Sequence, residues 1–352
     1  MFVVDWLDSA KRVLIDTKRL SKLFFLCLLT LVLITACHHR PNLSASGNAS
    51  LEGEGRLVTH AMGQTLVPPD PQRVVNLDPI TFEMVLALGS QPVGAPSPKY
   101  TFDQLQLAGD SEAILDVRGV ESADGFGSFQ PNLEKVLTLK PDLILGMAFV
   151  HKRIYRQLSQ IAPTVLLPGR LDTSASWRDA LELVGEALGK PEAVQKIIVD
   201  YDTRLADFQT RMGTRLAETE VSVARIYPDL SARLLLRKTF AGEILAHAGL
   251  ARPPAQSQNR AVRNITKERF ADADGDAMFI VTHDDAKIRQ ALKQQIETDP
   301  LWSQLPVVKR GNVYAVGDYW TCCGPLATNR VVDDLFEYLV GELEESGTVE
   351  VN

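Results

Sequence analysis

Apolar and polar residues in the middle of the chain follow a helical period, and they predict the longest helix of the protein. Between Pro191 and Met212, apolar residues recur at every third or fourth position, which is the spacing of one helix face. Pro191 suits a first helical turn because its missing N–H needs no partner there. A helix of this length spans roughly 33 Å at about 1.5 Å per residue, so it is long enough to join two lobes.

The residues before this helix predict a parallel α/β lobe. An apolar strand at Arg73–Leu77 is followed by a helix at Pro79–Leu88 and by a second strand entered at Pro92. Strand, helix and strand joined by short links are typical of a parallel sheet. A helix around Ile154–Gln160 and a strand at Thr164–Leu167 complete this lobe.

The residues after the long helix predict a second α/β lobe. Strands are expected at Val221–Pro228, around Leu234–Leu236 and at Val313–Val316, with a helix at Phe240–His247. The last helix is expected at Asn329–Leu343, where apolar residues form one stripe.

One short unit occurs once in each predicted lobe, at Pro131–Gly146 and at Asn264–Val281. Each copy has a capping residue, a glutamate two positions later and an aspartate eight residues after that: Asn132, Glu134 and Asp142, then Thr266, Glu268 and Asp276. This order predicts a helix start, a short helix and a buried strand. A glutamate in the first helical turn is stabilised by the helix dipole and faces solvent. Two such glutamates suggest a two-armed docking surface rather than a catalytic centre.

The amino-terminal residues resemble an export signal. Five basic residues precede an uncharged apolar stretch, Leu23–Thr35, which is shorter than the roughly 20 residues of a membrane span and suits a signal-peptide core. It ends in Ile34-Thr35-Ala36-Cys37, which looks like a lipobox whose cysteine is acylated. An ordinary signal anchor with a chance cysteine is the alternative. We predict a signal peptide over 1–36, a lipid on Cys37 and a flexible tether over 37–55.

Composition limits the classes of function. The 352 residues are 45% apolar, which suits about two domains. Without the 5 basic and 3 acidic residues of the leader, 32 basic residues face 41 acidic ones, a net charge near −9. Such a surface repels nucleic acid and offers no polybasic patch for a membrane.

The chain contains no motif that indicates catalysis or a resident metal. It lacks a dinucleotide fingerprint, a P-loop, a nucleophile elbow and a zinc-protease helix, so we predict no enzyme. Its 6 histidines are scattered, so no metal site is expected. The acidic run Asp272–Asp276 lacks the remaining ligands of a calcium loop. Cys322 and Cys323 are adjacent in the sequence. They either form a vicinal disulfide or are simply two small buried residues.

The order of motifs resembles one protein family. The blocks GQTLVPPDPQRVVNLD, QPNLEKVLTLKPDLILG, FAGEILAHAGLARP and DPLWSQLPVVKRGNVYAVGDYW are similar to those of ferric-siderophore substrate-binding lipoproteins of ABC importers. The resemblance runs from about Gly63 to Leu343. It implies the class III periplasmic binding protein fold: two Rossmann-like α/β lobes, here 56–190 and 214–352, joined by one long backbone helix, 191–213.

The same resemblance implies that a ferric siderophore is held between the lobes by basic and aromatic side chains. The positions that match by motif are Lys99, Tyr100, Arg225 and Trp320. Arg233 fits the strand that returns after Arg225 with a shift of one residue, and Tyr227 and Arg237 are neighbours that could substitute for these residues. Arg118 and Arg153 match less well. For each, a solvated arginine or a core aromatic is the alternative. Ala148 stands where some catecholate binders carry lysine, which favours a hydroxamate or citrate-type ligand.

The resemblance also implies the partners. Glu134 and Glu268 occupy the positions that dock onto arginines of an ABC permease dimer, which works with its ATPase. The protein is then a lipid-anchored monomer in the periplasm or on the cell envelope, with ferric siderophore as its ligand and no cofactor. Cobalamin or haem binding, and a ligand-sensing role, are the alternatives. Import itself requires no chemistry in this chain.

Overall fold

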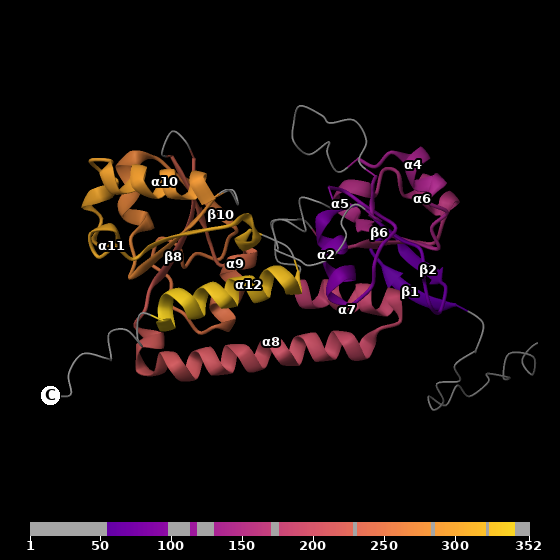
Figure 1. Cartoon of the computed structure of the whole chain (residues 1–352), viewed down its shortest axis with the longest axis horizontal. Coiled ribbons are helices and arrows are strands. Elements are labelled where there is room, and N and C mark those ends of the chain that lie inside the picture. The colour runs from indigo at the N-terminus through magenta and orange to yellow at the C-terminus, as the bar shows by residue number, and fades with distance from the viewer. Residues whose placement is uncertain are drawn as a thin grey trace, which may run out of the picture. The chain divides into compact units, whose positions relative to one another are not determined.

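The computed structural model describes residues 55–97, 113–117, 130–169, 176–227, 231–282, 286–321 and 324–341. All of them belong to one compact unit, Gly53–Asn352. Two five-stranded sheets organise this unit (Figure 1). The predicted signal peptide and Cys37 lie outside the described residues.

The first sheet is parallel throughout, with the strand order β5-β4-β3-β6-β7. Its strands are β3 (Val74–Asn76), β4 (Gly94–Ala95), β5 (Leu115–Asp116), β6 (Leu143–Met147) and β7 (Thr164–Leu167). An antiparallel hairpin, β1 (Arg56–His60) with β2 (Gly63–Val67), precedes it. The helices of this lobe are α2 (Pro79–Ala87), α4 (Leu133–Thr138), α5 (Ala148–His151), α6 (Tyr155–Ile161) and α7 (Trp177–Leu188). β6 is buried along its whole length, as a strand with neighbours on both sides of a parallel sheet requires, and the edge strand β7 is buried as well.

The second sheet is mixed, with the strand order β10-β9-β8-β11-β12. Its strands are β8 (Val221–Ile226), β9 (Ala232–Leu235), β10 (Val262–Ile265), β11 (Ala277–Val281) and β12 (Val313–Val316). β8, β11 and β12 are parallel, whereas β9 is antiparallel to both of its neighbours. The helices of the second lobe are α9 (Phe240–His247), α10 (Ala286–Thr298), α11 (Pro306–Lys309) and α12 (Pro325–Leu335). The lobe also contains short 3-10 turns, η3 (Gly213–Ala217), η4 (Lys267–Ala273), η5 (Trp302–Gln304) and η6 (Asp318–Trp320), and a π turn, η7 (Phe336–Val340). The last helix therefore begins four residues earlier than the sequence predicts, at Pro325.

The long helix α8 spans Pro191–Met212, as the apolar period predicts. It begins after Gly189, whose φ of 71° is accessible to glycine without steric cost. Its buried residues, from Val194 to Met212, form one stripe that packs against α7 and α12 (Figure 1). The predicted arrangement of two α/β lobes joined by one long helix is thus confirmed, and this helix packs along its length against both lobes.

The repeated unit ties neighbouring strands together in both lobes. Asp142, just before β6, accepts hydrogen bonds from the backbone N–H groups of Gln72 and Arg73, both at 2.8 Å. Asp276, just before β11, accepts one from the backbone N–H of Glu220 at 2.9 Å. Those donors directly precede β3 and β8, the strands that pair with β6 and β11. The first copy forms an α-helix and the second a 3-10 helix.

The hydrophobic core is shared between the lobes. One buried cluster of the described residues contains residues of both sheets together with residues of α7, α8, α9 and α12, whereas three smaller clusters lie in one lobe each. The carboxyl-terminal helix α12 contacts α2 of the first lobe as well as α8 and α9. The two lobes therefore have more than one connection.

Candidate ligand-binding site

Two predicted arginines lie together at the carboxyl end of the second sheet. Arg225 is near the end of β8 and is directly paired with Arg233 of the antiparallel strand β9. Residues paired in this way present their side chains on the same face of a sheet. In α/β folds ligands bind outside the carboxyl ends of parallel strands. The two guanidinium groups therefore lie at the edge where a ligand is expected.

Both arginines have polar or aromatic neighbours that hold them. Arg225 forms an ion pair with Asp318, and their side chains are 29% and 12% exposed. Arg233 donates from Nε to the Asn264 side-chain oxygen at 3.0 Å, and its guanidinium carbon lies 5.7 Å from the centre of the Tyr227 ring. A cation at that distance from a ring is attracted to its face. Arg225, Arg233 and Tyr227 thus form one cluster.

Asp318 is a site residue that sequence reasoning missed. It begins η6, two residues after β12 ends at Val316. The sequence did contain a signal for Asp318. It is an acidic residue just after a parallel strand, in a block that the family resemblance already associates with ligand. Its carboxylate orients the Arg225 guanidinium while leaving other N–H donors of that fork for a ligand.

Arg237 does not join this cluster, and the prediction that it substitutes for its neighbours needs correction. β9 is antiparallel to β8 and ends at Leu235, so Arg237 lies in the turn beyond the end of β9 that is remote from the carboxyl edge. Arg237 instead lies near the buried Arg252, whose pKa is lowered to about 9 by burial and then by the Arg237 charge. The sequence pattern did not reveal the strand direction on which this depends.

Trp320 is a core residue, so we remove it from the predicted ligand contacts. Its side chain is 0% exposed and stacks on Phe279 with ring centres 4.5 Å apart. Its indole N–H donates to Asp334 at 2.6 Å, and the Tyr319 hydroxyl donates to the same oxygen at 2.9 Å. Buried Trp and Tyr need such partners for their polar atoms. The alternative of a core aromatic is therefore correct here.

Several other predicted residues lie outside the described part of the chain. These are Lys99, Tyr100, Arg118, Cys322, Cys323 and the acylation site Cys37. Arg153 is described and exposed, in the turn before α6. It stays a weaker candidate.

The two predicted docking glutamates differ in what the structure describes. Glu134 lies in the first turn of α4 and is exposed, and the Asn132 side chain caps this helix by accepting from the Lys135 N–H at 3.1 Å. Glu268 lies in η4, in the matching position of the second copy. The placement of the Glu268 side chain lies outside the description.

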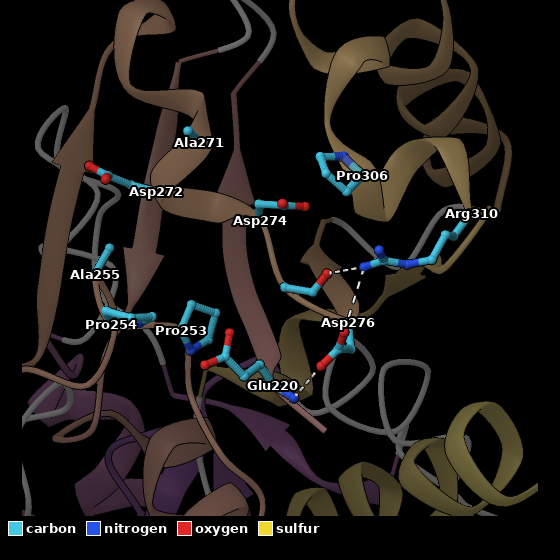
Figure 2. A pocket seen from close by; sticks show the side chains of 11 residues that line it. Glu220, Pro253, Pro254, Ala255, Ala271, Asp272, Asp274, Asp276, Pro306 and Arg310 are labelled. Atoms are coloured by element: carbon cyan, nitrogen blue, oxygen red, sulfur yellow. Dashed lines mark hydrogen bonds and ion pairs between the residues drawn. The ribbon is translucent and has the colours of Figure 1, made fainter. Parts of the chain in front are cut away.

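A cavity of about 560 Å³ opens at the opposite end of the second sheet (Figure 2). Glu220 and Asp276, which line it, directly precede β8 and β11, so it lies at the amino ends of these strands. Arg310 donates to the Gly275 carbonyl at 2.7 Å and lies 3.7 Å from Asp276. Asp274 accepts from the Val307 backbone N–H at 3.0 Å. These contacts give the acidic run a structural role.

Two further properties concern the described residues alone. They contain no group of three His, Cys, Asp or Glu side chains arranged to hold a metal ion. Among their helices, none has the length and apolar character that a membrane crossing requires.

The model of the periplasmic binding protein family matches residues 74–319. This chain belongs to that family. The probable siderophore-binding lipoprotein YfiY of Bacillus subtilis is 32% identical to this periplasmic binding protein, over 92% of this chain and 99% of its own length. The Fe(3+)-citrate-binding protein YfmC of the same organism is 28% identical, over 87% and 92%. The crystal structure of Staphylococcus aureus SirA complexed with staphyloferrin B matches with a TM-score of 0.64 and 29% identity, over 80% and 98%.

Proposed function

We propose that this periplasmic binding protein captures a ferric siderophore and delivers it to an ABC permease. The names of its relatives, which include binders of ferric siderophores and ferric citrate, support this ligand class. The observation that carries the proposal is the cluster of Arg225, Arg233 and Tyr227 at the carboxyl end of the second sheet. A ferric chelate presents many oxygen atoms and usually a negative charge, and this cluster offers positive, hydrogen-bond-donating groups to such a ligand.

Among ferric siderophores, we propose one with carboxylate donors. A guanidinium binds two oxygens of a carboxylate at once and stays charged. Two directly paired arginines suit a ligand with several carboxylates. Asp318 sits beside Arg225, so the pair is only partly neutralised by the protein itself. This proposal also agrees with Ala148, which adds no charge to the first lobe.

We further propose that the loaded protein docks onto the permease through Glu134 and Glu268. One glutamate on each lobe, exposed at Glu134 and at the matching position of the repeated unit at Glu268, suits a two-fold partner that carries arginines. Charge complementarity speeds and orients such encounters. A lipid on Cys37 would keep the protein at the membrane surface, where the permease is. Iron stays bound by the siderophore, so binding and release involve no covalent step in this chain.

Native mass spectrometry and tryptophan fluorescence test the ligand class. The purified full chain is titrated with ferric citrate, ferric staphyloferrin B, a ferric hydroxamate, a ferric catecholate and cobalamin. We expect the two carboxylate complexes to bind most tightly. Arg225→Ala is expected to weaken that binding by roughly tenfold or more, since hydrogen bonds to charged groups contribute about 1.5–3 kcal/mol.

Arg237→Ala is the matched control because it removes the same charge from the same lobe at the opposite end of β9. It is expected to leave the affinity within about twofold, well under the roughly 1.4 kcal/mol of a tenfold change. Equal losses in the two variants would indicate a general charge effect and contradict the proposed site. Tighter binding of cobalamin than of any ferric siderophore in the panel would show that the proposed ligand class is wrong.

A further inference from the structure

A buried carboxylate in the first lobe holds the carboxyl-terminal helix of the second. Glu83 lies in α2 and is 1% exposed. It accepts hydrogen bonds from the backbone N–H groups of Gly324 and Ala327, both at 2.8 Å. These are the residue before α12 and the third residue of that helix. The bonds join residues 241 and 244 positions apart in the chain.

The chemistry of the helix start explains why a carboxylate is suitable here. The first N–H groups of a helix have no partner within it, and the dipole favours a negative charge at this end. Pro325 has no N–H to satisfy, so Glu83 reaches the N–H groups on either side of it. The fit is close, because a Cβ on Gly324 would lie 3.2 Å from Met84 Cγ and 3.3 Å from Glu83 Cδ.

Helix α12 in turn holds the segment that carries Asp318. Asp334 of α12 accepts from Tyr319 and Trp320, which follow Asp318 in η6. Asp318 pairs with Arg225 at the end of β8. A chain of direct contacts therefore runs from Glu83 in the first lobe to the arginine cluster in the second.

The same helix is attached to the connecting helix α8. Arg204 of α8 donates to the Asn329 side-chain oxygen at 2.7 Å and pairs with Asp333. Both partners belong to α12. α12 is thus held from two sides, by α8 along its length and by Glu83 at its amino end.

We propose that Glu83 is a positioning residue for ligand binding: by holding the start of α12, it fixes the η6 segment and the Arg225–Asp318 pair relative to the first lobe. This inference rests on the proposed function only for the identity of the ligand. The coupling itself is a property of the protein without ligand. When only a fraction of the molecules has the binding geometry, the apparent affinity for ligand falls to that fraction of its full value.

Hydrogen exchange of the ligand-free full chain tests the coupling directly. Glu83→Ala is compared with the unsubstituted protein and with Leu158→Ala, which opens a cavity in the core of the first lobe, where Leu158 is fully buried. The informative amides are those of Trp320 and Thr321, which donate to the carbonyls of Gly317 and Asp318. We expect Glu83→Ala to raise their exchange rates about tenfold, the effect of losing one to two hydrogen bonds, and Leu158→Ala to leave them unchanged.

Glu83→Gln keeps one acceptor oxygen and is expected to give an intermediate rate. It guards against the chance that the alanine variant fails to fold. An increase confined to the first lobe or to Gly324–Ala327, with η6 as protected as before, would overturn the proposal. Equal increases at η6 in Glu83→Ala and Leu158→Ala would also overturn it, because general destabilisation would then suffice.

Binding of ferric staphyloferrin B, measured by calorimetry, forms the second arm. Glu83→Ala is expected to weaken it about tenfold when the arginine geometry is fixed in about a tenth of the molecules, while Leu158→Ala keeps the affinity. If staphyloferrin B does not bind the unsubstituted protein, the proposed ligand is wrong. The exchange result then still decides whether Glu83 fixes η6, and the affinity comparison is made with the complex from the titration panel that does bind. If η6 exchanges faster and the affinity is unchanged, Glu83 couples the lobes without positioning the ligand site, and the proposal fails.

Discussion

Burial raises the pKa of the Glu83 carboxyl to about 7, and the backbone N–H groups of Gly324, Leu326 and Ala327 oppose this to a smaller extent. The unfolded chain has the ordinary value of 4.5. Between these two pH values the folded protein binds a proton that the unfolded chain releases, so stability falls as pH rises. The difference corresponds to a loss of about 3 kcal/mol, at roughly 1.4 kcal/mol per pKa unit.

Urea unfolding at pH 5 and pH 8 measures this effect. The unsubstituted protein is expected to be less stable at pH 8, and Glu83→Gln, which cannot titrate, is expected to lose most of that difference. Asp334 has a pKa raised to about 6 by burial and acts in the same direction in both proteins, so the comparison isolates Glu83. An identical pH dependence in the two proteins would show that Glu83 stays ionised throughout.

Trp320 yields a second prediction at this scale. Trp320→Phe retains an aromatic ring against Phe279 and removes the donor to Asp334. We expect a loss of about 1–3 kcal/mol in unfolding free energy, since the hydrogen bond joins a buried pair. Any loss of ligand affinity is expected to accompany this loss of stability, because the same bond holds η6 against α12. Calorimetry measures both quantities. A large loss of affinity at unchanged stability would return Trp320 to the ligand site.

These two residues show what could be predicted from the sequence at single positions. Glu83 stands in the helix PITFEMVLA, whose remaining residues are almost all apolar, and a helix without a polar face is buried. Our sequence analysis did not use that signal of a buried carboxylate, and the signal does not reveal the partners of Glu83, which are more than 200 positions away. Trp320 stood in the expected block, yet nothing local distinguishes an aromatic that contacts ligand from one that fills a core.

At the scale of elements, the repeated unit makes a stability prediction. Asp142→Ala leaves the N–H groups of Gln72 and Arg73 without their carboxylate, and we expect a loss of about 1–3 kcal/mol. Asp276→Ala is expected to cost somewhat less, because one such bond is lost. Urea unfolding measures both. The control is Asp207→Ala, which removes an exposed ion pair with Arg211 and should change stability by less than about 0.5 kcal/mol.

An element was predictable where one apolar period continues over many residues. It was not predictable where its position depends on whether a strand runs parallel or antiparallel to its neighbour. Helix α8 carries its apolar stripe over 22 residues, so its bounds follow from the sequence. β9 has only 4 residues, and its apolar composition fits a parallel or an antiparallel neighbour equally well. The placement of Arg237 depended on that direction, which is set by the short connection from β8 and by pairing with β10.

At the scale of the whole molecule, the docking proposal predicts a separation of binding from transport. Glu134→Ala combined with Glu268→Ala is expected to reduce uptake of iron from the siderophore in cells by tenfold or more, which corresponds to about 1.4 kcal/mol, while calorimetry shows normal ligand affinity. Exposed glutamates elsewhere in each lobe provide the control, Glu182→Ala with Glu297→Ala. Equal uptake in both double variants would contradict docking through the repeated unit.

The connections between the lobes predict how far they move. Helix α8 packs along its length, one buried cluster extends through both lobes, and Glu83 holds α12 at the first lobe. Closing the lobes by a large angle would break these contacts together, which is unfavourable because packed cores resist deformation. Small-angle scattering is therefore expected to show little change in the radius of gyration on binding ferric staphyloferrin B, because the backbone at the interface of a pre-organised complex typically shifts by about 1 Å or less. Glu83→Ala should show a broader distribution of distances than the unsubstituted protein before ligand is added, because one connection is lost while α8 remains. Strong compaction of the unsubstituted protein on binding would contradict this expectation. It would mean that the contacts between the lobes break when ligand binds.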